Sequence, residues 1–142
     1  MVEKIIYDGL LYAIVIRREF REPGIHFFTP DDFSQQLAYM LRPAGYQIQP
    51  HFHREVHRDV HQTQEVLVIK RGRMRVDFYD KTQHKIGFCT LNESDVILLS
   101  AGGHGFEMET DCEIIEIKQG PYMGDEDKVR FDAAPIDTAP LQ

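Results

Sequence analysis

Short runs of apolar residues, many of them β-branched, alternate with turns rich in Gly and Pro along most of the chain. Runs of this length with period-two alternation are typical of β-strands, and helical periodicity is scarce. A succession of short strands favours an all-β sandwich or barrel, because closure removes exposed strand edges. The expected strands are residues 11–17, 37–41, 46–52, 65–70, 74–79, 85–91, 95–98, 105–109 and 112–118.

Two segments depart from the strand pattern. The Pro-Asp-Asp sequence at residues 30–32 predicts a helix of one or two turns, because proline suits the first helical position and acids suit the positive end of the helix dipole. After Gly124 the chain becomes acidic and contains Pro135 and Pro140. This composition predicts an extended arm outside the core.

The length of 142 residues suits one domain with one core. We expect a single domain over residues 1–142, with N-terminal strands in 1–36, a core in 37–118 and a C-terminal arm in 119–142. Cys89 and Cys112 lie in strand-like runs without a C-x-x-C motif, so we expect two reduced thiols.

The charge balance excludes some classes of partner. The formal net charge is −7, from 23 acids and 16 bases, whereas a nucleic-acid-binding protein normally carries a basic face. The longest apolar stretch, residues 10–16, is seven residues, far from the ~20 that a transmembrane helix needs. The first residues do not resemble a signal peptide. We therefore expect a cytoplasmic protein that binds neither nucleic acid nor membrane.

Histidines are concentrated in one short segment, where His51, His53, His57 and His61 fall within eleven residues. On a strand, alternate side chains share a face, so His51 and His53 could bind the same metal ion. Glu65 opens the next apolar run of the chain. Farther along, a Gly-Gly turn precedes His104, the last of the seven histidines.

These residues resemble the two motifs of the cupin family. The first, G-(x)5-H-x-H-(x)3,4-E-(x)6-G, is similar to Gly45, His51, His53, Glu65 and Gly72, except that eleven residues separate His53 from Glu65. The second, G-(x)5-P-x-G-(x)2-H-(x)3-N, is matched more loosely by residues 94–108. There Ser94, Ser100 and Met108 replace Gly, Pro and Asn, one residue separates Gly102 from His104, and the histidine is retained.

The resemblance implies a jelly-roll β-barrel with one divalent metal ion bound by His51, His53, Glu65 and His104. Three imidazoles and a carboxylate suit Fe, Mn, Ni or Zn and leave coordination positions open. The plainer alternative is a solvated His-rich loop, with Glu65 an ordinary charge at a strand end. His57 and His61 are expected to be loop residues that bind no metal, and His26 and His84 surface residues.

Strand parity suggests which side chains surround the ion. Phe106 and Met108 share a face with His104, Leu67 and Ile69 with Glu65, and Gln49 with His51. Arg75 and Tyr79 could orient an anionic substrate if their face of strand 74–79 lines the barrel. The sequence leaves open whether that face looks inward or into solvent.

Two classes of function follow. The first is a metalloenzyme of the dioxygenase or isomerase type that acts on a small polar molecule. The second is a non-catalytic cupin module that binds or senses a small ligand. A third reading is an interaction protein without metal. In each case we expect a homodimer, because cupins commonly pair through their sheets.

Overall fold

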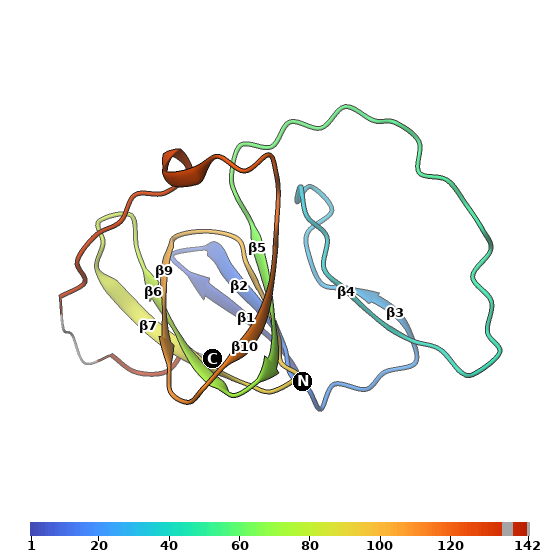
Figure 1. Cartoon of the computed structure of the whole chain (residues 1–142), viewed down its shortest axis with the longest axis horizontal. Coiled ribbons are helices and arrows are strands. Elements are labelled where there is room, and N and C mark those ends of the chain that lie inside the picture. Colours follow the sequence, from blue (N-terminus) through green and yellow to red (C-terminus); the bar gives the residue numbers. More distant parts are fainter. Residues whose placement is uncertain (135–137, 142) are drawn as a thin grey trace. The chain divides into compact units, whose positions relative to one another are not determined.

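The computed structural model describes residues 1–134 and 138–141 and is built from β-strands (Figure 1). The predicted arm residue Pro135 lies outside the described residues. Within them there is no α-helix, and no helix is long and apolar enough to cross a membrane. The elements are β1 (Val2–Tyr7), β2 (Leu10–Ile16), β3 (Gly24–Phe27), β4 (Ala38–Leu41), β5 (Glu65–Arg71), β6 (Arg73–Tyr79), β7 (Lys85–Asn92), β8 (Val96–Leu99), β9 (Gly103–Met108), β10 (Glu113–Lys118) and the 3-10 helix η1 (Gly124–Asp127).

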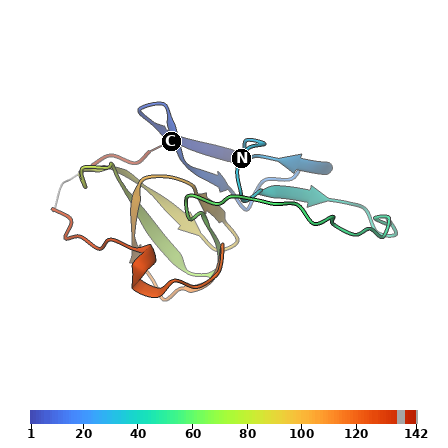
Figure 2. The same cartoon turned by 90° about the horizontal axis from the view of Figure 1, so that it is seen from above.

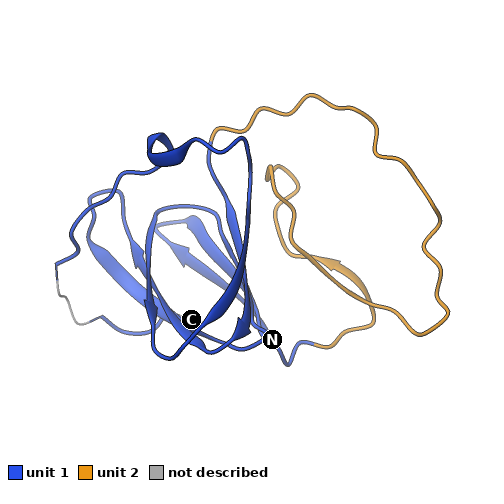
Figure 3. Cartoon of the chain, viewed as in Figure 1, with its two compact units in different colours: residues 1–20, 62–142 blue, residues 21–61 orange. Residues whose placement is uncertain are grey.

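The chain forms two compact units (Figure 3). The larger unit contains residues 1–20 and 62–142, and the smaller unit contains residues 21–61. In the larger unit, strands β1-β2-β8-β5-β10 form one antiparallel sheet and β7-β6-β9 form a second. In the smaller unit, β3 pairs with β4. The described strands thus form three open sheets and no closed barrel, and the single-domain organisation stays a prediction.

The core of the larger unit lies between its two sheets. Alternate residues of β5, including Leu67 and Ile69, and of β6, including Met74, Val76 and Phe78, belong to one buried cluster. Side chains alternate across a strand, so this cluster decides which face of each strand looks inward. The question that the sequence left open for β6 is therefore answered: Met74, Val76 and Phe78 face the core.

Most of the expected strands are present, with ends shifted by one or two residues. The strand predicted over residues 46–52 is wrong, because that segment is irregular. Apolar alternation there has no neighbouring strand to pair with, and a strand needs such a partner for its backbone hydrogen bonds. The helix predicted at residues 30–32 is also wrong. The segment is a turn in which the Gln36 amide donates to the carbonyl oxygens of Pro30 and Phe33, at 2.9 and 3.0 Å.

Two strands, β1 and β3, lie in residues 1–36, where N-terminal strands were expected, but neither was among the strands predicted individually. β1 forms a hairpin with β2 through Asp8 and Gly9, which have φ values of 49° and 73°. Asp-Gly between two apolar runs is among the strongest hairpin signals, because both turn residues need positive φ. The Asp-Gly pair could therefore have revealed β1 from the sequence.

The C-terminal segment leaves β10 and contains η1 (Figures 1 and 2), and Pro140 forms an isolated bridge with Phe88 of β7. The amide of Leu141 donates to the Phe88 carbonyl at 2.7 Å, and the Leu141 side chain packs against the core cluster. A Cβ on Gly87 would lie 2.4 Å from Leu141 Cγ. The C-terminal arm was expected to lie outside the core. Its end departs from that expectation, because Leu141 packs against the core at the position where Gly87 has no side chain.

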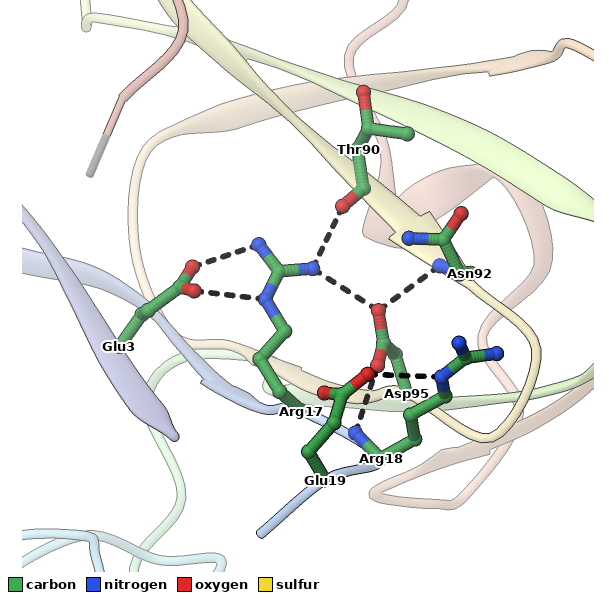
Figure 4. A network of polar contacts seen from close by, with 7 residues as sticks. All are labelled: Glu3, Arg17, Arg18, Glu19, Thr90, Asn92 and Asp95. Carbon is green, nitrogen blue, oxygen red and sulfur yellow. Dashed lines mark hydrogen bonds and ion pairs between the residues drawn. The ribbon is translucent and has the colours of Figure 1, made fainter.

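A polar network ties the two sheets of the larger unit together (Figure 4). Arg17, which follows β2, donates to both carboxylate oxygens of Glu3 at 2.8 and 2.7 Å, to the Thr90 carbonyl at 2.7 Å and to Asp95 at 3.0 Å. Asp95 is 1% exposed and also accepts the backbone amides of Arg18 and Asn92, both at 2.9 Å. The three donors offset the free-energy cost of burying the Asp95 carboxylate. Together these hydrogen bonds link β1, β7 and the turn before β8 to the residues that follow β2.

Replacing Asp95 by Ala should lower the free energy of unfolding by about 3 kcal/mol, because three donors lose a buried partner. Urea denaturation measures this change. Glu93→Ala, in the same turn but exposed, is the control and should shift stability by less than about 0.5 kcal/mol. Equal effects of the two substitutions would show that the network contributes nothing specific.

Ser94 has a φ of 69°, the left-handed region in which non-glycine residues are strained. Ser94→Gly should therefore raise the free energy of unfolding by about 0.5 to 1 kcal/mol. Thermal unfolding of the Gly and Ala variants side by side provides the measurement. A glycine variant no more stable than the alanine variant would contradict this account of the turn.

Candidate functional site

One carboxylate and one imidazole from different sheets meet in the larger unit. Glu65 is the first residue of β5 in one sheet, and His104 lies on β9 in the other. Glu65 Oε2 and His104 Nε2 are 3.1 Å apart, and their side chains are 10% and 28% exposed. A carboxylate oxygen only accepts, so the imidazole Nε2 donates this hydrogen bond.

Strand register explains the meeting. Glu65 shares its face of β5 with Leu67 and Ile69, which belong to the core cluster. His104 lies directly opposite Phe78 of β6, whose side chain is fully buried in the same cluster. Cross-strand partners project to the same side, so both functional groups point into the space between the sheets.

The turn before β9 places His104 and depends on glycine. Gly102 has a φ of 70°, and a Cβ at this position would lie 2.0 Å from the Tyr12 ring. Any side chain would clash with that ring and strain the backbone. The glycine therefore lets the chain pass from β8 into β9 close to the aromatic ring.

The Glu65 carboxylate is held in its charged form. The hydrogen bond from His104 lowers the pKa of Glu65, an effect that burial opposes and the charge of Lys118 supports. Lys118 Nζ lies 3.9 Å from Glu65 Oε1 and 3.2 Å from Glu116 Oε1. The carboxylate thus has an imidazole on one oxygen and an ammonium group near the other.

The distance between Glu65 and His104 suits two ligands of one metal ion. Metal–ligand bonds of about 2.1 Å at right angles separate the two donor atoms by roughly 3.0 Å. The observed 3.1 Å is close to that separation and equally suits the hydrogen bond present. Binding a metal ion here would require displacement of the proton on Nε2.

His51 and His53 lie in the irregular segment of the smaller unit. The strand from which their shared face was inferred is absent, yet their ring centroids are 5.3 Å apart. His51 Nδ1 donates to the Gln49 carbonyl at 2.9 Å, so Nε2 is the ring nitrogen that could bind a metal ion. This is the ring arrangement commonly found in metal-binding histidines.

Among the described residues, no three His, Cys, Asp or Glu side chains are grouped so as to hold a metal ion. Glu65 and His104 form one pair, and His51 and His53 form another. The four-ligand site therefore stays a prediction.

The comparisons with known proteins add no assignment. The chain matches no protein-family model, no curated protein and no solved structure. The cupin resemblance accordingly rests on the residues that carry its two motifs.

The predicted pocket residues occupy different surroundings. Leu67 and Ile69 are buried in the core cluster, whereas Phe106 and Met108 are exposed on the inward side of β9. Gln49 lies in the smaller unit, where its backbone contacts His51.

Arg75 and Tyr79 lie on the face of β6 opposite to the core, so they do not share the side of Glu65 and His104. Arg75 forms ion pairs with Asp77 at 2.9 Å and Glu107 at 2.7 Å. The ring of Tyr79 lies against Gly105 of β9 and packs edge-on against the ring of Phe131, with the ring centroids 5.2 Å apart. These contacts occupy both side chains on the outer face of the sheet.

The other histidines have local contacts. His57 is exposed and lies 3.0 Å from Asp59, and His61 is exposed in the same segment. His84 contacts Thr82 at 2.7 Å in the β6–β7 turn, and His26 contacts the Pro23 carbonyl at 3.0 Å.

Lys118 is the functional candidate that sequence analysis missed. It ends β10 directly opposite Glu65, the first residue of β5. Its position at the end of an expected strand was visible, but antiparallel pairing with β5 was not. The antiparallel register of β10 on β5 places the Lys118 ammonium group beside the Glu65 carboxylate.

Both cysteines are free, as expected. Burial raises the pKa of Cys89 to about 12, so at pH 8 only about one molecule in ten thousand carries its thiolate.

In the folded protein a thiol reagent should therefore label Cys112 and leave Cys89 unmodified until denaturant is added. Absorbance of the released chromophore follows the labelling.

The two Ser variants test the assignment of each labelling phase. Cys112→Ser should remove the labelling seen in the folded protein, whereas Cys89→Ser should remove only the phase that follows unfolding. Rapid labelling in folded Cys112→Ser would contradict the buried placement of Cys89.

Proposed function

We propose that this chain is a small cupin that binds one divalent metal ion and acts on a small molecule. Its ligands would be Glu65 and His104 of the larger unit together with His51 and His53. The two sheets of the larger unit would form the cupin-type jelly roll. The homodimer and the cytoplasmic location expected from the sequence belong to the same proposal.

The observation that carries this proposal is the 3.1 Å approach of Glu65 Oε2 to His104 Nε2. These two residues come from the two separate sequence motifs, and the fold of the larger unit brings them together. A carboxylate and an imidazole are ordinary ligands for Fe, Mn, Ni and Zn.

The residues of the chain would have distinct roles. Glu65 would supply negative charge to the ion, and its low pKa keeps the carboxylate available at neutral pH. His104 would bind through Nε2 after losing the proton that it now shares with Glu65. The Gln49 carbonyl would hold His51 in the orientation that leaves Nε2 free. A bound ion would supply a Lewis-acid or redox centre with positions open to a small molecule.

Catalysis and simple binding remain separate outcomes within this proposal. An enzyme of the dioxygenase or isomerase type would consume oxygen or convert a metabolite only when metal is present. A binding module would retain a ligand without turnover. Loss of turnover in His51→Ala would support the enzyme, and unchanged turnover would contradict it.

Metal analysis of the purified, reconstituted protein tests the site itself. The wild type should hold about one equivalent of metal, and Glu65→Gln or His104→Ala should weaken binding at least about a hundredfold, because each removes a direct ligand. His51→Ala and His53→Ala should have effects of similar size. Titration with Co²⁺ followed by visible absorption measures each affinity.

Two histidines outside the proposed ligand set provide matched controls. His57→Ala, in the same segment as His51 and His53, and His84→Ala should each retain the wild-type affinity. Less than about a tenth of an equivalent in the reconstituted wild type would end the proposal. Full affinity in both His51→Ala and His53→Ala would remove these two residues from it.

A further inference from the structure

The segment that follows β10 starts beside Glu65. Lys118, the last residue of β10, lies directly opposite Glu65. The next residue holds the chain there, because the backbone amide of Gln64 donates to Gln119 Oε1 at 2.7 Å. The segment therefore leaves its sheet at the end of the core where Glu65 and His104 meet.

Two further contacts attach this segment to both sheets of the larger unit. On the side of β5, the Thr63 hydroxyl donates to Asp127 Oδ1 at 2.9 Å. On the side of β6 and β9, the Phe131 ring packs edge-on against Tyr79, and a Cβ on Gly103 would lie 3.5 Å from Phe131 Cζ. Figure 1 shows the segment passing from the end of β10 to the side of β6 and β7.

These anchors lie on either side of the Glu65–His104 pair. Thr63 is two residues before Glu65, and Gly103 is the residue before His104. Residues 127–131 connect the two anchors, and four steps of extended chain span at most about 14 Å. Packed sheets are about 10 Å apart, so this short connection crosses directly over the gap between the two sheets.

The crossing residues bring charge close to the pair. Lys128 has φ and ψ values of −133° and 139°, an extended conformation that suits a direct crossing. The hydrogen bond from His104 is the main cause of the low pKa of Glu65, and the positive charge of Lys128 lowers that pKa further. The segment is therefore close enough to the carboxylate to act on its charge.

The segment is loosely packed between its anchors. None of the four residues of η1 is buried, and Tyr122 and Val129 are each 86% exposed. Segments with few buried apolar contacts open locally at a lower free-energy cost than core strands do. The contacts of Asp127 and Phe131 therefore decide whether the segment stays closed.

We propose that residues 119–131 form a lid over the Glu65–His104 end of the core and control the access of small molecules to it. The lid is held to one sheet by Asp127 and to the other by Phe131. With the lid closed, the side chains of Glu65 and His104 are 10% and 28% exposed. This inference needs no metal ion at the pair, so its outcome is separate from that of the proposed metal site.

Acylation of His104 by diethyl pyrocarbonate measures access to the pair. The reagent modifies neutral imidazoles that it can reach, and mass spectrometry resolves each histidine. A chelator is present at one fixed pH, so that no bound metal ion protects His104. His84, whose side chain is 72% exposed in the β6–β7 turn, is the reference within each sample. In the wild type, His104 should react about tenfold more slowly than His84, because the reagent reaches it mainly when the lid opens.

Substitutions at the two anchors should open the lid. Phe131→Ala and Asp127→Ala should each raise the His104 rate about fivefold and leave the His84 rate unchanged. Thr63→Val removes the donor of the hydrogen bond to Asp127 and should have the same effect as Asp127→Ala. Combining these two substitutions should add little, because both remove one interaction.

Two exposed side chains of the same segment provide matched controls. Tyr122→Ala removes an aromatic ring and Val129→Ala an aliphatic side chain, and both variants should react as the wild type does. Labelling of the buried Cys89 detects general unfolding in every variant. If Phe131→Ala exposes Cys89, the Asp127→Ala variant decides the question.

Hydrogen exchange tests whether the lid moves. The amides of residues 124–131 should exchange at least about a hundredfold faster than those of β5 and β6. Exchange as slow as in these strands would show a fixed segment and overturn the lid. Unchanged His104 rates in both Phe131→Ala and Asp127→Ala would overturn it as well, whether or not the protein binds metal.

Discussion

The buried contact between Arg17 and Asp95 is the constraint on which the larger unit depends. A carboxylate that is 1% exposed requires donors, and Arg17 supplies one while also binding Glu3 and the Thr90 carbonyl. These partners lie on β1, on β7 and in the turn before β8. Because each donor and acceptor must be satisfied at once, the network holds the two sheets in one relative arrangement.

That arrangement brings the functional groups together. β8 pairs with both β2 and β5, so the turn at Asp95 is linked to the strand that begins with Glu65. On the other sheet, β6 sets the register of β9 and thereby the position of His104. The carboxylate, the imidazole and Lys118 meet because three strand registers place them at the same end of the core.

The same registers decide which apolar residues are buried and which are exposed. The inward side chains of β5 and β6 are enclosed between the sheets, whereas Phe106 and Met108 on the inward face of β9 are exposed. Arg75 and Tyr79 lie outside this arrangement because they occupy the outer face of β6.

The sequence by itself determined the all-β class, most strand positions and the inward parity of Glu65 and His104. These properties follow from period-two alternation, which is local and survives without knowledge of pairing. Alternation failed at residues 46–52, because the same pattern forms a strand only where another strand offers its backbone. Only the tertiary structure decided that Lys118 lies beside Glu65 and that β9 is open, since register and cover depend on segments far apart in the chain.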